Sequence, residues 1–167
     1  MKLWCKLQFG IDLERYQKAK QRYYNTNEFI NKTTNGTISG NGNYYINQAV
    51  FSFHYQSRAI YLNSDSKVLL EACSFHNNSS TDHGGSFLIE NSDCILVRIC
   101  CSFSILMKNT SDNIHLYGCA YEISLPDDSN NKSYAFECSI SQCSGETASF
   151  YHRRSDCLLY TSPSPRD

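Results

Sequence analysis

An internal repeat is the feature of this 167-residue chain that most restricts its fold. The segment from Ala59 to Phe75 aligns without a gap with the segment from Phe87 to Phe103, 28 residues further on, and the two share six identical residues. The identities form two blocks, Asn-Ser-Asp and Cys-Ser-Phe, with apolar residues matched between them. Self-similarity at a period of roughly 20 to 50 residues is typical of solenoids and other repeat arrays.

Weaker copies of the unit flank this pair. Residues 52–54 match residues 74–76 at an offset of 22, and residues 138–140 resemble residues 101–103 at an offset of 37. Loops absorb such changes in length, and we expect residues 126–132 to form an inserted loop. The chain therefore contains about four copies of the unit.

Each copy consists of short apolar segments separated by Asn, Ser and Asp, which is the pattern of strand, turn, strand. A strand of this length buries only a few side chains, so one unit cannot offset the cost of ordering its backbone and must stack on others. We therefore predict an all-β fold, a right-handed parallel β-helix solenoid of about four coils. Its repeat-signature core residues are predicted to be Phe53, Cys73, Phe75, Cys101, Phe103, Cys138 and Ile140.

Three regions are predicted along the chain: a leader at 1–43, β-helix coils at 44–156 and a tail at 157–167. In the leader, the spacing from Ile11 to Tyr24 predicts a short amphipathic helix, either a solvated leader or a polar cap on the solenoid, and residues 31–43 are expected to form a Gly- and Asn-rich loop. The tail resembles a translated sequencing adapter, so we exclude it from the fold and expect the natural protein to continue past Asp156.

Composition and charge limit the classes of partner that we expect. A formal net charge of -1 gives no basic surface for nucleic acid. No apolar run reaches the roughly 18 residues of a membrane-spanning helix, and the first residues contain no stretch typical of a cleavable signal peptide. No cofactor is expected.

Residues 75–78 and 84–87 carry a resemblance to known families. Phe75-His-Asn-Asn78 and Gly84-Gly85-Ser86-Phe87 resemble the Phe-x-x-Asn and Gly-Gly-Ala-Ile elements of polymorphic outer-membrane-protein repeats. The second element departs from the pattern at Ser86 and Phe87. The chain is also similar to the Cys-rich right-handed β-helix surface proteins of parasitic flagellate protists. The resemblance covers about residues 44–145 and implies a cell-surface or secreted protein that recognises a host or cell-surface protein or glycan.

Eight cysteines precede the tail, and their spacing matches no paired zinc-binding pattern; they are Cys5, Cys73, Cys94, Cys100, Cys101, Cys119, Cys138 and Cys143. Because Cys73, Cys101 and Cys138 recur at the same place in the repeat, we expect a stacked column of small buried side chains, with disulfides between coils as the alternative. No metal site and no catalytic thiol are predicted.

Asp82-His83-Gly84-Gly85 invites comparison with polysaccharide-cleaving enzymes of the pectin lyase-like fold. Such enzymes need clustered carboxylates for acid and base work, whereas this chain offers only Asp127 and Asp128 in an expected loop. We interpret His83 as a solvated turn residue and predict no catalytic residues. Six Asn-x-Ser/Thr sequons lie in predicted loops and are candidate glycosylation sites: Asn31, Asn35, Asn77, Asn78, Asn109 and Asn131.

Three functions stay open at this point. The repeat and the lack of a catalytic set favour a non-enzymatic surface or secreted adhesion protein. The sequence around His83 favours a carbohydrate-active lyase or hydrolase on the same scaffold. The missing signal peptide favours a structural or interaction module inside the cell.

Overall fold

The fold is all-β with parallel sheets, as the repeat predicts. The computed structural model describes residues 29–32, 35–107, 118–126, 130–145, 148–153 and 159–160. Within these ranges there are seventeen short strands, and every pairing between them is parallel. The helix predicted within residues 11–24 lies outside the described residues. In the described part of the chain, no helix has the length and apolar character needed to cross a membrane.

The strands form three larger sheets and one small one. Sheet 1 contains β1 (Phe29–Lys32), β3 (Asn43–Asn47), β6 (Lys67–Glu71), β10 (Asp93–Val97), β14 (Ser133–Phe136) and β17 (Leu159–Tyr160). Sheet 2 contains β2 (Ile38–Ser39), β5 (Ile60–Leu62), β9 (Phe87–Glu90), β13 (Tyr121–Ser124) and β16 (Phe150–Arg153). Sheet 3 contains β4 (Val50–Ser52), β7 (Ser74–His76), β11 (Cys100–Ser102) and β15 (Ser139–Ser141), and sheet 4 contains β8 (Ser79–Ser80) and β12 (Ile105–Leu106).

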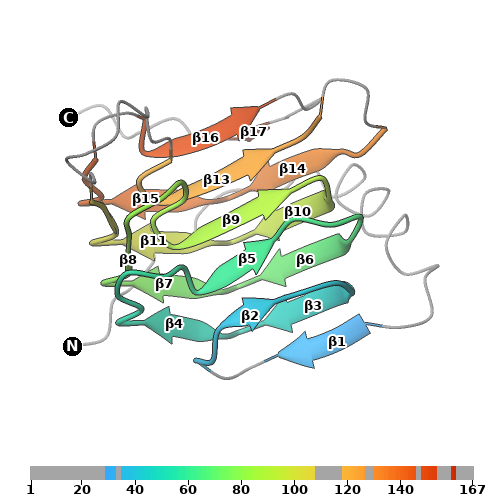
Figure 1. Cartoon of the computed structure of the whole chain (residues 1–167), viewed down its shortest axis with the longest axis horizontal. Coiled ribbons are helices and arrows are strands. Elements are labelled where there is room, and N and C mark those ends of the chain that lie inside the picture. The colour runs from blue at the N-terminus through green and yellow to red at the C-terminus, as the bar shows by residue number, and fades with distance from the viewer. Residues whose placement is uncertain are drawn as a thin grey trace.

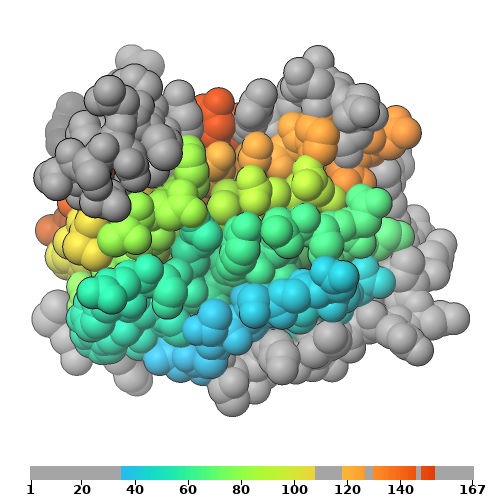
Figure 2. Space-filling view, viewed as in Figure 1, coloured from blue at the N-terminus to red at the C-terminus, as the bar shows by residue number. Residues whose placement is uncertain are grey.

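The chain visits the sheets in a fixed order, from sheet 2 to sheet 1 to sheet 3, and then returns to sheet 2 (Figure 1). We call β2–β4, β5–β8, β9–β12 and β13–β15 passes one to four. Each pass lays its strands beside those of the pass before, and the passes form successive coloured layers on the face shown in Figure 2. This arrangement is compatible with a parallel β-helix.

The register between passes differs from the alignment of the repeat. Ile60 pairs with Phe87, an offset of 27, and Phe75 pairs with Cys101, an offset of 26. The turn between β5 and β6 spans residues 63–66, whereas the turn between β9 and β10 spans only residues 91–92. Relative to the 28-residue alignment, one residue is already missing at sheet 2, and a second is lost across this turn, since Lys67 pairs with Asp93 at an offset of 26. The identical letters in the two copies are therefore displaced by two residues in sheets 1 and 3.

Because of this displacement, two of the predicted core residues do not lie in the core. Phe53 and Phe103 stand level with Asn77, since consecutive backbone bonds run from Phe53 N to His76 O and from Asn77 N to Ser102 O. All three take a left-handed φ, between 51° and 61°. Phe53 is 58% exposed and Phe103 38% exposed. Their prediction as core residues is wrong, because they follow the strand at a turn and do not lie on its inward face.

The core runs through all passes and is built around stacked aromatic rings. Phe51 stacks on Phe75 with ring centroids 5.0 Å apart, Phe75 contacts Phe87 at 4.8 Å, and Phe87 stacks on Tyr121 at 4.6 Å. These four rings are almost completely buried. Such pairs stabilise a fold beyond the effect of their buried area, so they hold neighbouring passes together along the core.

The remaining predicted core residues lie in or against this core. Cys73, Phe75 and Cys101 are fully buried, and Cys138 and Ile140 are partly buried against the same cluster.

The strands extend beyond the boundaries that the sequence suggested. β1 and β2 lie inside the predicted leader of residues 1–43, and Ile38 in β2 is only 3% exposed. At the other end, Leu159 in the predicted tail pairs with Ala135 in sheet 1. Short apolar segments can add to an open parallel edge even where the repeat motif is absent.

Candidate functional site

Aromatic side chains lie in water on three successive passes, and we call Phe53, Tyr55, His76 and Phe103 the aromatic stripe. Phe53, Tyr55 and Phe103 are 58%, 62% and 38% exposed, while His76 is half-buried between the two phenylalanines. Phe53 and Tyr55 follow pass one's last strand, His76 ends β7 in pass two, and Phe103 follows β11 in pass three.

The rings of the stripe contact one another in sequence. Phe53 lies 6.3 Å from Tyr55, and His76 meets Phe53 at 6.3 Å and Phe103 at 5.2 Å, both edge to face. The imidazole of His76 is also held by Ser102, whose Oγ lies 2.9 Å from its Nδ1. The stripe is therefore an ordered surface in which ring positions are fixed by neighbours on adjacent passes.

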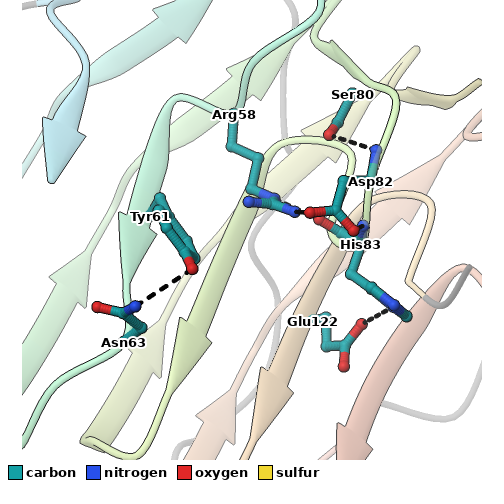
Figure 3. A network of polar contacts seen from close by, with 7 residues as sticks. All are labelled: Arg58, Tyr61, Asn63, Ser80, Asp82, His83 and Glu122. Atoms are coloured by element: carbon teal, nitrogen blue, oxygen red, sulfur yellow. Dashed lines mark hydrogen bonds and ion pairs between the residues drawn. The ribbon is translucent and has the colours of Figure 1, made fainter.

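A second candidate site is a polar network over sheet 2 (Figure 3). The Arg58 guanidinium contacts the Asp82 carboxylate at 2.6 Å, donates to the backbone carbonyl of His83, and lies 4.9 Å above the Tyr61 ring. Burial alone would raise the pKa of Asp82, but the hydrogen bond from the His83 N–H and the positive charge of Arg58 outweigh it and lower that pKa. Asp82 is therefore ionised at neutral pH.

His83 joins this network to a buried acid. Its Nδ1 lies 3.0 Å from Oε2 of Glu122, which is only 6% exposed, whereas the His83 side chain is 27% exposed. Burial raises the pKa of Glu122, and the neighbouring His83 opposes that rise. A partly exposed imidazole against a buried carboxyl can accept and donate a proton. His83 lies in a turn and is partly exposed, as the sequence predicted, but its ring also contacts Glu122, which the sequence did not predict.

Sequence reasoning missed Glu122 because 39 positions separate it from His83 and no local motif marks it. Only the parallel pairing of β13 with β9, at Glu122 and Leu88, brings it to this face. Asp127 and Asp128, the carboxylates that the sequence singled out, lie outside the described residues.

The Gly84-Gly85 pair positions His83 for a steric reason. Gly84 has a φ of 68°, and a Cβ at that position would lie 2.2 Å from the Phe87 carbonyl oxygen. A Cβ on Gly85 would lie 2.0 Å from the carbonyl oxygen of Cys119. Both positions therefore exclude a side chain. The two glycines form the tight connection between the Asp82-His83 turn and the start of β9.

The candidate glycosylation sites differ in accessibility. Asn78 is only 1% exposed, and its amide donates to the Phe51 carbonyl, so it is a structural residue in the folded chain. Asn35 is exposed, although its amide donates to the backbone of Ser52 at 3.0 Å. Asn77 and Asn131 are half-buried and hydrogen-bonded. The side chain of Asn31 and the whole of Asn109 lie outside the described residues.

The predicted cysteine column is only partly formed. Backbone bonds place Cys73 level with Ile99, and Ile99 level with Cys138. Cys101 instead pairs with Phe75 and Ile140. The two-residue displacement of the repeat separates Cys101 from the column. No disulfide joins any two cysteines of the described residues. In the same part of the chain, no group of three or more His, Cys, Asp or Glu residues is arranged to hold a metal ion.

Comparison of the chain with protein-family models, with curated proteins and with solved structures found no match.

Proposed function

We propose that this chain is a right-handed parallel β-helix that acts as a non-catalytic recognition protein, and that the aromatic stripe binds a neutral, extended polysaccharide. The fold proposal is supported by the parallel register of successive passes. The functional proposal is supported by the stripe, because large aromatic groups that remain in water together mark interaction surfaces. A protein with this role would act as a surface or secreted adhesion protein.

The spacing of the stripe fits a sugar chain. Neighbouring parallel strands lie about 4.8 Å apart, so Phe53 and Phe103, two passes apart, stand about 10 Å from each other along the stack. Two consecutive sugar rings of an extended polysaccharide cover a comparable length. The C–H faces of sugars carry slight positive charge and pack on the negative face of an aromatic ring.

The chemistry of the stripe favours an uncharged ligand. None of its four residues is Asp, Glu, Lys or Arg, so no fixed charge attracts a polyanion such as a uronic acid polymer. Tyr55 is 62% exposed, and its hydroxyl can hydrogen-bond to sugar hydroxyls.

Calorimetric titration with a β-1,4-linked glucan hexasaccharide tests this function. We expect saturable binding that weakens at least tenfold in the double variant Phe53→Ser, Phe103→Ser. Met107→Ser is the matched control, because Met107 is also 37% exposed but belongs neither to the stripe nor to the network over sheet 2, and this variant should bind as the unmodified chain does. Absence of binding at millimolar sugar, or equal binding by the double variant, would contradict the proposal.

One observation favours a second candidate function, cleavage of a polysaccharide at the network over sheet 2. Glu122 and His83 form a carboxyl–imidazole pair in which burial raises the pKa of the carboxyl, as acid–base catalysis requires. Release of new reducing ends from a polysaccharide, abolished by both His83→Ala and Glu122→Gln, would establish it. Retention of all activity in either variant would remove it.

A further inference from the structure

Four thiols that are distant in sequence converge where pass four packs on pass three. Burial raises the pKa of Cys101 well above its usual range, and the neighbouring thiols Cys143, Cys138, Cys100 and Cys119 add to that rise. Packing shows the same convergence: Cys138 and Cys143 lie against the main core, and Cys143 also packs in a small cluster with Cys119 and Leu106. Cys119 and Cys143 therefore share one apolar site.

The backbone beside Cys143 approaches Cys119 closely. A Cβ placed on Gly145 would lie 2.8 Å from the Cys119 Cβ and 3.1 Å from the Leu106 Cβ. Ser144 is anchored there by a bond from its N–H to the Ser104 carbonyl oxygen at 3.0 Å. The segment that carries Cys143 is thus fixed against the segment that carries Cys119.

The two cysteines occupy the two ends of one pass. Cys119 precedes β13 by two residues, and Cys143 follows β15 by two residues. We propose that Cys119 and Cys143 form a disulfide that closes pass four covalently into a ring. The bond would join the start of the pass covalently to its end, which in the reduced chain are held in contact by the apolar cluster of Cys119, Cys143 and Leu106.

The reaction is thiol–disulfide exchange with a small disulfide such as glutathione disulfide. The half-buried Cys143 thiolate attacks one sulfur of glutathione disulfide and releases one glutathione thiolate. The Cys119 thiolate then attacks the Cys143 sulfur, displaces the second glutathione thiolate and completes the bond. The two cysteine protons are taken up by the released glutathione, so two thiols and one disulfide give one disulfide and two thiols.

The rate at which the Cys119–Cys143 disulfide forms should depend on pH. Burial raises the pKa of both Cys119 and Cys143 above the ordinary thiol value. The reacting thiolates are therefore scarce at neutral pH, and the bond should form faster as the pH rises toward 9 and beyond.

Peptide mapping without reduction, on the full chain after incubation with glutathione disulfide, tests the proposal. We expect one major cross-linked peptide that joins Cys119 to Cys143, with Cys73 and Cys94 still alkylatable after unfolding. Closing a loop of this length should raise the melting temperature by about 10 °C. Cys143→Ser should abolish both effects, whereas Cys100→Ser, which removes another half-buried thiol near Cys101, should leave both intact.

Three outcomes would overturn the proposal. The first is a mixed glutathione disulfide on Cys143 with Cys119 unmodified. The second is a dominant link from Cys143 to Cys138 or Cys100. The third is release of bound zinc from the purified chain on treatment with a mercurial, with protection of the same thiols, which would identify the cluster as a metal site.

Discussion

At the scale of single residues, left-handed backbone positions decide where each pass turns. Between sheets 1 and 3 the turn residues are Gln48, Ala72, Arg98 and Glu137, with φ between 51° and 54°. None is glycine or asparagine, the residues that usually signal such a conformation. The turns therefore could not be predicted from the sequence, although the register of passes two and three, an offset of 26, is the same on both sides of them.

Phe103 and Phe75 offer a direct test of this register. Phe103→Asn should leave the free energy of unfolding unchanged or raise it slightly, because Asn tolerates a left-handed φ and Phe103 is partly in water. Phe75→Ala should lower it by about 3–5 kcal/mol, since a buried ring is lost. Urea unfolding measures both, and equal losses would show that Phe103 is a core residue after all.

Gly84 tests the tight entry into β9. Gly84→Ala should destabilise the chain by about 2–4 kcal/mol, because its Cβ would meet the Phe87 carbonyl oxygen at 2.2 Å. Gly40→Ala is the control: Gly40 also has a positive φ, 95°, but nothing lies within 4 Å of an added Cβ, so only the backbone cost of about 1–2 kcal/mol applies. The same loss in both variants would mean that the contact with Phe87 is absent.

At the scale of elements, β16 places a histidine in an apolar column of sheet 2. His152 pairs with Ile123, which pairs with Ile89, and the latter two are fully buried. Burial lowers the pKa of His152 to about 4, and its Nε2 lies 3.3 Å from the Tyr121 hydroxyl. The folded strand therefore holds a neutral imidazole.

This histidine should make the fold sensitive to acid. Because its folded pKa lies below the unfolded value of about 6.5, the unfolded chain binds the extra proton first, and stability is lost as the pH falls from about 6.5 toward 4. By pH 4 the free energy of unfolding should have fallen by about 3 kcal/mol. His152→Gln should remove that part of the pH dependence. Urea unfolding between pH 7 and 4 measures the slope, and identical slopes for both chains would refute the assignment.

At the scale of the whole molecule, the internal repeat predicted the class of fold correctly but not the register between passes. The alternation of apolar and polar segments was enough to predict an all-β chain with parallel strands. The same letters misaligned sheets 1 and 3, because two shifts of one residue each, one present at sheet 2 and one across the turn that follows it, change the register without changing the motif. The predicted core was accordingly right at Phe75 and wrong at Phe53.

The candidate sites were harder to foresee than the fold. The aromatic stripe was hidden because Phe53 and Phe103 resembled core residues of the repeat. The network over sheet 2 needed Glu122, which only the stacking of passes brings beside His83. Both sites depend on contacts between passes, and those contacts follow from the observed register.

The register between passes is thus the central claim, and nuclear Overhauser contacts between the rings and side chains of neighbouring passes test it most directly. With phenylalanine and cysteine selectively labelled, we predict contacts from Phe75 to Phe51 and from Phe75 to Cys101, with none from Phe75 to Phe103. A Phe75–Phe103 contact together with a missing Phe75–Cys101 contact would restore the 28-residue register and contradict the account.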